Sequence, residues 1–194
     1  VSNAVQSIRR PSANRARSRR LEPEEEAKLL EALCTGGRDE CGRFVPGARN
    51  PWIKSIVLLA LETAMRRGEI LSMCWDAVDL ERRTVFLAMT KNCDARTVPL
   101  STRAVELLAT LPRSDDARVF PVTENALKHV WVRACSTAGI DDLHFHDLRH
   151  EATSRLAEKL PNIVELAAVT GHRDVKMLAR YYHPRIVDLV RKLI

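Results

Sequence analysis

The feature that most constrains the fold is a single change in the spacing of apolar residues. Apolar residues recur at helical spacing along most of residues 21–194, for example in WIKSIVLLALETAM at 52–65. The exception is a pair of short β-branched segments, TVFLAM at 84–89 and RTVPL at 96–100. They are typical of a β-hairpin with its turn around residues 92–94. The sequence therefore predicts an α+β fold that is mainly α, with one small antiparallel β-sheet.

Residues that favour helix ends bound the segments with helical spacing. Residues 21–33 open with a proline and a run of acids, which suit the positive end of a helix. Residues 35–51 are rich in Gly, Pro and charge, which indicates a loop. The other expected helices are 52–65, 66–75, 101–112, 122–140 and three or four short ones from residue 146 onward.

Length and composition indicate a globular domain. A chain of 194 residues, 45% of them apolar, suffices for one domain with a core and a tail. No apolar run approaches the length that spans a bilayer, and the first ten residues contain no stretch of signal-peptide type. We therefore expect a cytoplasmic protein with no membrane partner. The five cysteines form no C-x-x-C pair, which argues against a disulfide framework and a structural zinc site.

The net charge of +6 comes entirely from the first twenty residues, which contain no acid. Beyond them, 25 basic residues balance 25 acidic ones. We expect residues 1–20 to form a basic arm or interdomain linker, and residues 21–194 to form the folded domain. Two interpretations of the arm stay open: contact with nucleic-acid phosphates, and a solubilising tail. Its arginines are Arg9, Arg10, Arg15, Arg17, Arg19 and Arg20.

Arg66, Glu69 and Lys91 are the first candidates for a functional site. Arg66 and Glu69 lie three residues apart, so on a helix their side chains share a face. Lys91 lies in the expected hairpin turn. Taken alone, the first two are typical of a surface ion pair and the lysine of a solvated cation. A functional interpretation therefore depends on other groups.

The stretch HFHDLRH at 144–150 places three candidates on one expected helix start. His146 and Arg149 lie three residues apart, and His150 lies four after His146. An H-x-x-x-H pair can bind zinc, but no Glu follows His146 and no third ligand is suggested nearby. The alternative is an imidazole that transfers protons beside a fixed guanidinium, a combination that suits a phosphate.

The only two tyrosines of the chain are adjacent, at positions 181 and 182. If residues 174–183 form an α-helix, Tyr182 continues an apolar stripe with Val175, Leu178 and Ala179 and belongs to the core. Tyr181 then projects away from that stripe, where its hydroxyl can reach a group outside the core. Without the other candidates, Tyr181 would be a half-exposed surface aromatic.

Together these groups resemble the catalytic domain of the tyrosine recombinases, the phage integrase family. The family pattern is an arginine in T-G-[LM]-R-x-x-E, a hairpin lysine, H-x-x-R, G-H, and a tyrosine about nine residues later. The matching groups, in the same order, are Thr63 to Glu69, Lys91, His146 to Arg149, Gly171-His172 and Tyr181.

Three positions depart from the family pattern. Ala64 replaces the usual glycine, Thr170 stands where leucine often precedes Gly-His, and Cys93 lies where glycine is common. We expect none of them to touch a proposed catalytic side chain, so we interpret them as packing variation. Family members also usually carry a separate DNA-gripping domain before the linker, so we expect this chain to be a catalytic fragment.

The resemblance implies that DNA strands are cleaved and rejoined without a metal or another cofactor. Arg66 and Arg149 would clamp the non-bridging phosphate oxygens, and His172 would donate a further hydrogen bond to them. Glu69 and His150 would orient the neighbouring arginine and histidine side chains.

The resemblance also assigns the proton transfers. Tyr181 would attack phosphorus and form a 3′-phosphotyrosyl intermediate, while Lys91 protonates the departing 5′-oxygen. His146 is the expected acceptor of the tyrosine proton. Two rival functions stay open: a non-catalytic DNA-binding protein of the same fold, and a type IB topoisomerase.

The implied partners are double-stranded DNA and further copies of the protein, as a tetramer in the synapse. The implied source is a bacterium or a phage. Residues 185–194 place apolar side chains on one helical face, which either packs on its own domain or docks on a neighbouring copy. The target site, and the choice between integration, excision and resolution, do not follow from the sequence.

Overall fold

A computed structural model describes residues 17, 19–34, 36–38, 41, 44–45, 50–88, 95–113, 116–182, 190 and 193. Its α-helices are α1 (Pro23–Ala32), α2 (Trp52–Thr63), α3 (Arg67–Leu71), α4 (Thr102–Ala109), α5 (Glu124–Thr137), α6 (Asp147–Lys159) and α7 (Ile163–Thr170). The 3₁₀ helices are η2 (Trp75–Ala77), η3 (Val175–Met177) and η4 (Ala179–Tyr181). The strands are β1 (Gly37–Arg38), β2 (Phe44–Val45), β3 (Val78–Asp79), β4 (Thr84–Leu87) and β5 (Arg96–Pro99). The prediction of a mainly helical α+β fold with a small antiparallel sheet is confirmed.

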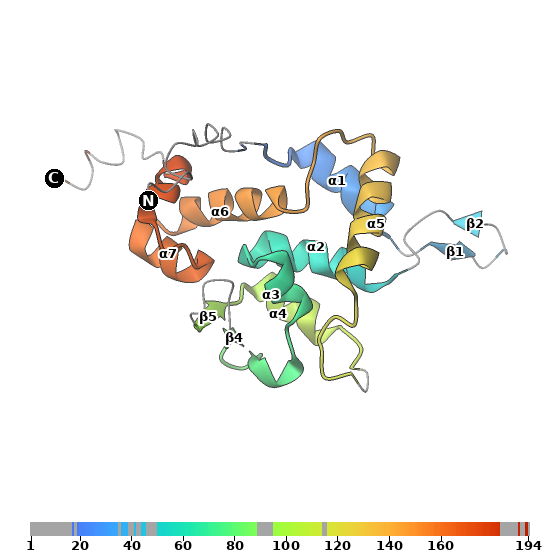
Figure 1. The fold of residues 1–194 in the computed structure, drawn as a ribbon, viewed down its shortest axis with the longest axis horizontal. Coiled ribbons are helices and arrows are strands. Elements are labelled where there is room, and N and C mark those ends of the chain that lie inside the picture. Colours follow the sequence, from blue (N-terminus) through green and yellow to red (C-terminus); the bar gives the residue numbers. More distant parts are fainter. Residues whose placement is uncertain are drawn as a thin grey trace, which may run out of the picture.

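Helix α2 is the centre of the fold (Figure 1). It is apolar on nearly every side, as a helix covered all round must be, and Ile53, Ile56 and Leu59 are fully buried. Helices α4 and α6 both contact α2. One hydrophobic cluster therefore joins most of the molecule, and it runs from Leu21 to Leu148.

A second, smaller cluster lies under α7 and the short helices that follow it. Its buried members are Ala157, Leu166 and Leu178, and Tyr181 packs against them. Helices α6 and α7 contact each other, and both lie toward the end of the molecule that is remote from the β1–β2 ribbon (Figure 1).

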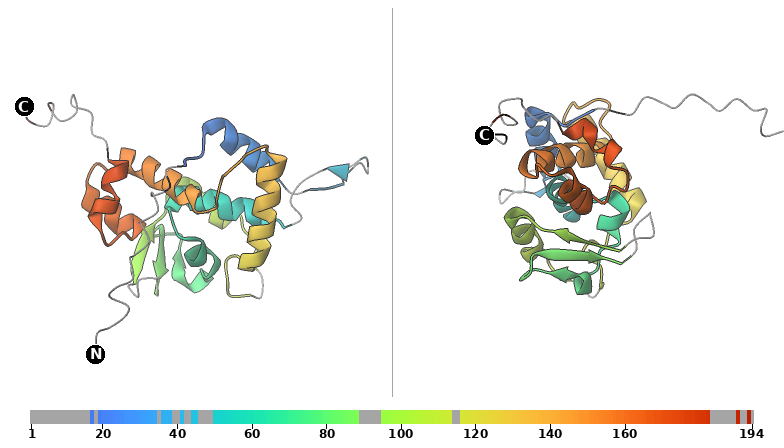
Figure 2. Two further views of the ribbon diagram at one scale, coloured as in Figure 1. Left: turned by 45° about the horizontal axis from the view of Figure 1, so that its top comes forward. Right: turned by 90° about the vertical axis from the view of Figure 1, so that its left-hand side faces the viewer.

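The predicted hairpin is confirmed in its strands, β4 and β5, which pair antiparallel with Val85 opposite Val98. Both valines are fully buried, and the sheet lies on one side of the helical body (Figure 2). Strand β3 adds a third member to the sheet. The sequence analysis missed β3 because two residues are too few to show a period. The hairpin turn, with Lys91, lies outside the described residues.

Two expectations about the elements were wrong. The segment 35–51 contains the paired strands β1 and β2 rather than a loop alone. The segment 66–75 is not one helix, because α3 ends at Leu71 and Cys74 forms an isolated β-bridge with Arg118. No helix in the described part of the chain is long and apolar enough to cross a bilayer.

Candidate active site

Arg66 and Glu69 are joined as the sequence predicted, but they are half of a larger buried network. Arg66 precedes the first residue of α3 and donates its backbone N–H to Glu69 Oε2 at 2.8 Å. Its Nη1 donates to Glu69 Oε1, also at 2.8 Å. Its Nη2 donates to the carbonyl of Gly171 at 3.2 Å, which links α3 to the segment after α7.

The other half of this network is Arg96, a residue that the sequence analysis missed. From the start of β5, Arg96 donates to both Glu69 oxygens, at 2.9 and 2.8 Å. Burial by itself raises the pKa of Glu69, but the hydrogen bonds from Arg96 and Arg66 outweigh it and hold that pKa below its ordinary value. Glu69 is therefore ionised, and its carboxylate accepts hydrogen bonds from both Arg66 and Arg96.

Arg149 lies on α6 and is almost completely buried. Its Nη1 donates to the carbonyl of Ala64 and its Nη2 donates to the carbonyl of Thr170, the latter at 2.7 Å. Burial, followed by the positive charge of Arg66, lowers the pKa of Arg149 to about 10. Arg149 therefore remains charged at neutral pH, and two carbonyl groups fix its position.

His172 lies beside Arg149, with 3.4 Å between His172 Nε2 and Arg149 Nη2. Burial lowers the pKa of His172 to about 4, with further lowering by Arg149 and Arg66. The Thr170 hydroxyl lies 2.7 Å from His172 Nδ1 and donates its own proton to the carbonyl of Leu166. Because that proton is used, the hydroxyl accepts from His172 Nδ1–H, which leaves a lone pair on Nε2.

Tyr181 reaches the site through a hydrogen bond between its hydroxyl and His150 Nδ1. Burial raises the pKa of Tyr181, and the positive charges of Arg180 and Arg149 oppose this only in part. Burial also lowers the pKa of His150, as it does that of His146. A protonated phenol therefore faces a neutral imidazole that can accept its proton.

His146, which the sequence analysis expected to accept the tyrosine proton, is not the histidine that contacts the Tyr181 hydroxyl. The ring of His146 packs edge-on against His150, with 5.3 Å between centroids, and His150 makes the contact with Tyr181. The reason is the start of α6: His146 precedes the first helical residue, whereas His150 lies one turn along, on the side that η4 covers.

The prediction that Tyr182 belongs to the core and Tyr181 points away from it was wrong. Both tyrosines are half-buried, and it is Tyr181 that packs on the second cluster with Leu178. The segment forms 3₁₀ turns instead of an α-helix, and residues three apart eclipse each other in a 3₁₀ helix. This spacing places Tyr181 on the same side as Leu178.

The expectation that none of these departures touches a proposed catalytic side chain was wrong for Ala64 and Thr170. Ala64 ends α2 in the left-handed region, with φ of 53°, and presents its carbonyl to Arg149. Thr170 supplies the hydroxyl that holds His172. Cys93 lies outside the described residues.

The described arginines of the basic arm bind carboxylates of the folded domain. Arg17 contacts Asp147 and Asp142, and Arg19 contacts Glu25. Arg20 contacts Glu151. The other arm positions, Arg9, Arg10 and Arg15, lie outside the described residues, and contact between the arm and a nucleic acid stays a prediction.

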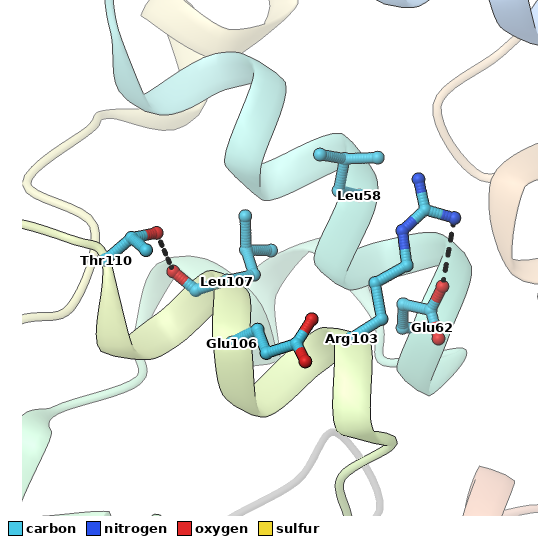
Figure 3. A pocket seen from close by; sticks show the side chains of 6 residues that line it. All are labelled: Leu58, Glu62, Arg103, Glu106, Leu107 and Thr110. Carbon is cyan, nitrogen blue, oxygen red and sulfur yellow. Dashed lines mark hydrogen bonds and ion pairs between the residues drawn. The ribbon is translucent and has the colours of Figure 1, made fainter.

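A shallow pocket between α2 and α4 is lined by Leu58, Glu62, Arg103, Glu106, Leu107 and Thr110 (Figure 3). Arg103 and Glu62 form an ion pair across it, at 3.5 Å. None of the predicted site residues lines this pocket. Among the described residues, no group of three or more His, Cys, Asp or Glu is arranged to hold a metal ion.

Comparison with known proteins gives a consistent assignment. The profile described as "Phage integrase family" matches residues 19–186. The shufflon-specific DNA recombinase of Escherichia coli is 42% identical over 98% of this chain and 47% of its own length. The integrase of Salmonella phage P22 is 29% identical over 91% of this chain and 46% of its own. The chain thus spans about half the length of these curated relatives.

Solved structures agree with the sequence comparison. The catalytic domain of bacteriophage HP1 integrase is 26% identical, with a TM-score of 0.65, over 89% of this chain and 93% of that domain. A lambda integrase dimer bound to a core site has a TM-score of 0.68 over 91% of this chain and 63% of its own. At 19% identity, it shows the fold alone. With the matching motifs, these comparisons show that the chain belongs to the phage integrase family of tyrosine recombinases.

Proposed function

We propose that this chain carries the active site of a site-specific DNA recombinase that cleaves and rejoins strands through a 3′-phosphotyrosyl intermediate. One observation above all supports this: the Tyr181 hydroxyl forms a hydrogen bond with the neutral imidazole of His150. The same tyrosine is close enough to the buried Arg149 for a Coulomb interaction between them. A phenol, an acceptor for its proton and fixed positive charge thus occur together. These are the needs of an attack on a phosphodiester.

In the proposed reaction, the scissile phosphate binds to Arg66 and Arg149. Both guanidinium groups are held by protein acceptors, so little side-chain reorganisation is needed when the phosphate arrives. His172 Nε2 lies next to Arg149, and the negative phosphate favours a proton on this nitrogen. His172 then donates to a non-bridging oxygen as the transition state gains charge.

The covalent step forms a bond between Tyr181 Oη and phosphorus and breaks the bond from phosphorus to the 5′-oxygen. The phenol proton passes to His150 Nδ1, which takes the role that the sequence analysis gave to His146. Lys91, which precedes β5 in the sequence, is proposed to protonate the 5′-oxygen, as the family resemblance implies; β5 itself brings Arg96 to the site. Rejoining reverses these transfers, so no external energy source is required.

The larger assembly is also a proposal. Solved relatives include recombinases bound to DNA and a dimer on its core site. We propose double-stranded DNA and further copies of the protein as partners, with four copies in the synapse. Residues 1–20 would act as the linker to a DNA-gripping domain, and residues 21–194 as the catalytic domain.

The test is capture of the covalent intermediate. The protein, at the length its gene encodes, is incubated with nicked duplexes that cover the DNA flanking that gene. We expect a protein–DNA adduct that resists denaturation in the wild type and in Tyr182→Phe, and none in Tyr181→Phe. Denaturing electrophoresis with labelled DNA measures it.

The outcomes separate the rival functions. No adduct in the wild type, with DNA binding retained, supports a non-catalytic binding protein and overturns the proposal. An adduct accompanied by relaxation of plasmids with one site, and no exchange between paired sites, supports the topoisomerase. An adduct that persists in Tyr181→Phe and is lost in Tyr182→Phe overturns the choice of nucleophile.

A further inference from the structure

Arg96 is a largely buried charged group near the site to which the proposed reaction gives no task. It leaves the sheet at the start of β5, and its side chain is only 11% exposed. Both its Nη atoms contact Glu69, and its Nε is buried without a hydrogen-bond partner among the described residues. Burial of an arginine fork costs free energy, so its position calls for a compensating role.

The first part of that role is the charge of Glu69. This carboxylate contacts Arg66 and Arg96, so the three groups together carry one net positive charge. Without Arg96, Glu69 and Arg66 would form a neutral pair. The attraction of Arg66 for a phosphate would then fall, because the carboxylate lies 2.8 Å from its guanidinium and largely cancels its field.

The second part concerns Gly171, which precedes His172. Gly171 has a φ of +68°, and a Cβ built on it would lie 2.6 Å from Arg96 Nη1 and 2.8 Å from Cζ. The guanidinium therefore lies against the bare backbone of Gly171, whose carbonyl accepts from Arg66. Only a glycine fits both the left-handed backbone and this approach. Arg96 thus supports the turn that places His172.

We propose that Arg96 is a positioning residue for strand cleavage. It balances the negative charge of Glu69, so that this carboxylate does not cancel the attraction of Arg66 for the scissile phosphate, and it supports the Gly171–His172 turn. This inference rests on the proposed function. Arg96 also ties the strand next to the lysine-bearing turn to α3, so one side chain joins three parts of the site.

The experiment compares two substrates that differ in charge only at the reacting phosphorus. Cleavage rates at saturating DNA are measured with an ordinary scissile phosphate and with a neutral methylphosphonate at the same position. Arg96→Met, which keeps the length and removes the charge, is expected to slow cleavage of the phosphate about 10- to 100-fold. The defect should shrink on the methylphosphonate, because a neutral linkage depends less on the charge of Arg66.

Two further variants separate charge from packing. Glu69→Gln added to Arg96→Met removes the carboxylate that would neutralise Arg66, and we expect it to restore part of the lost rate. Arg96→Lys keeps the charge but lacks the flat fork beneath Gly171, so its defect should be smaller and similar on both substrates. Arg118→Met is the matched control, because Arg118 also binds a carboxylate through two nitrogens, that of Asp116.

Failure of this inference differs from failure of the proposed function. A wild type that forms no adduct overturns the function itself. An active wild type with an undiminished Arg96→Met variant overturns only the role of Arg96. Equal defects on both substrates, without rescue by Glu69→Gln, would show that Arg96 acts only in packing. If Arg96→Met does not fold, the Arg96→Lys variant and the double variant test the proposal instead, through their cleavage rates on the same two substrates.

Discussion

At the scale of single residues, the contact between His150 and Tyr181 supports the proposed proton transfer. The phenol faces His150 Nδ1, and burial raises the pKa of the phenol and lowers that of the imidazole. Burial thus makes the tyrosine a poor spontaneous nucleophile, and it keeps the histidine unprotonated and ready to accept. With these pKa shifts, we expect the proton to pass directly from the phenol to the imidazole.

The pH dependence of cleavage tests this path. His150→Ala should lower the cleavage rate at neutral pH by about 10²- to 10⁴-fold. The defect should diminish as pH rises, because solvent then removes the phenol proton. Rates from single-turnover cleavage between neutral and mildly alkaline pH measure it. His146→Ala is the matched control, and a larger defect there than in His150→Ala would return the acceptor role to His146.

His172 provides a second prediction, on stability. Its folded pKa of about 4 lies below the ordinary value of about 6.5, so the unfolded chain binds more protons between these two pH values. Stability should therefore fall as pH drops from about 6.5 towards about 4, and His146 and His150 act in the same direction.

Urea unfolding at a series of pH values measures this dependence. His172→Gln should reduce the slope of stability against pH in that window, because it removes one of the groups that differ between the folded and unfolded states. The exposed His129 offers a matched control, His129→Gln. An unchanged slope in His172→Gln would contradict the assigned pKa.

At the scale of elements, the end of α2 determines where Arg149 lies. Ala64 adopts a left-handed conformation, and its carbonyl thereby meets the guanidinium of Arg149. Such a conformation costs an alanine about 1–2 kcal/mol. The following capping arrangement, in which Arg66 precedes α3 and is held by Glu69, fixes the start of the next helix.

Substitutions at Ala64 test this description. Ala64→Gly should change the free energy of unfolding by less than about 1 kcal/mol, because relief of strain offsets the greater chain entropy of glycine and the loss of one buried methyl. Ala64→Val should destabilise by roughly 2 kcal/mol or more, since a β-branched residue suits the left-handed region poorly. Denaturant unfolding measures both; a stable valine variant would contradict the assigned backbone.

At the scale of the whole molecule, α6 joins the described part of the basic arm to the proposed active site. One side of α6 carries Asp147 and Glu151, which bind Arg17 and Arg20. Arg149 and His150 project from the same helix into the site. Arg155 extends the charged side to Glu26 on α1, so Arg20 of the basic arm, α1 and α6 form one ion-pair network.

A double-mutant cycle measures how strongly the basic arm is held on α6. Arg20→Met and Glu151→Gln should show a coupling of about 0.5–1 kcal/mol, because the arginine is half-exposed and solvent screens the pair. The coupling should decrease as salt is raised. The exposed pair of Arg82 and Asp79 serves as the control and should couple more weakly. Equal coupling in the two pairs would show that the ion-pair network does not hold the basic arm.

The sequence by itself determined the fold class, the strands of the hairpin and several of the groups that the structure brings together. Helical and strand periods report burial directly, and the motif residues keep their spacing along the chain. Arg66, Arg149, His172 and Tyr181 are brought together as the motifs indicated, through the contacts of α3, α6, α7 and η4.

Only the tertiary structure decided which partner each group has. His150, rather than His146, contacts Tyr181, because 3₁₀ turns instead of an α-helix determine where the tyrosine side chain points. Arg96 joins Glu69 from 27 residues away because the hairpin folds back on α3. The spacing of residues within a segment does not predict such contacts, since they depend on how elements distant in sequence pack.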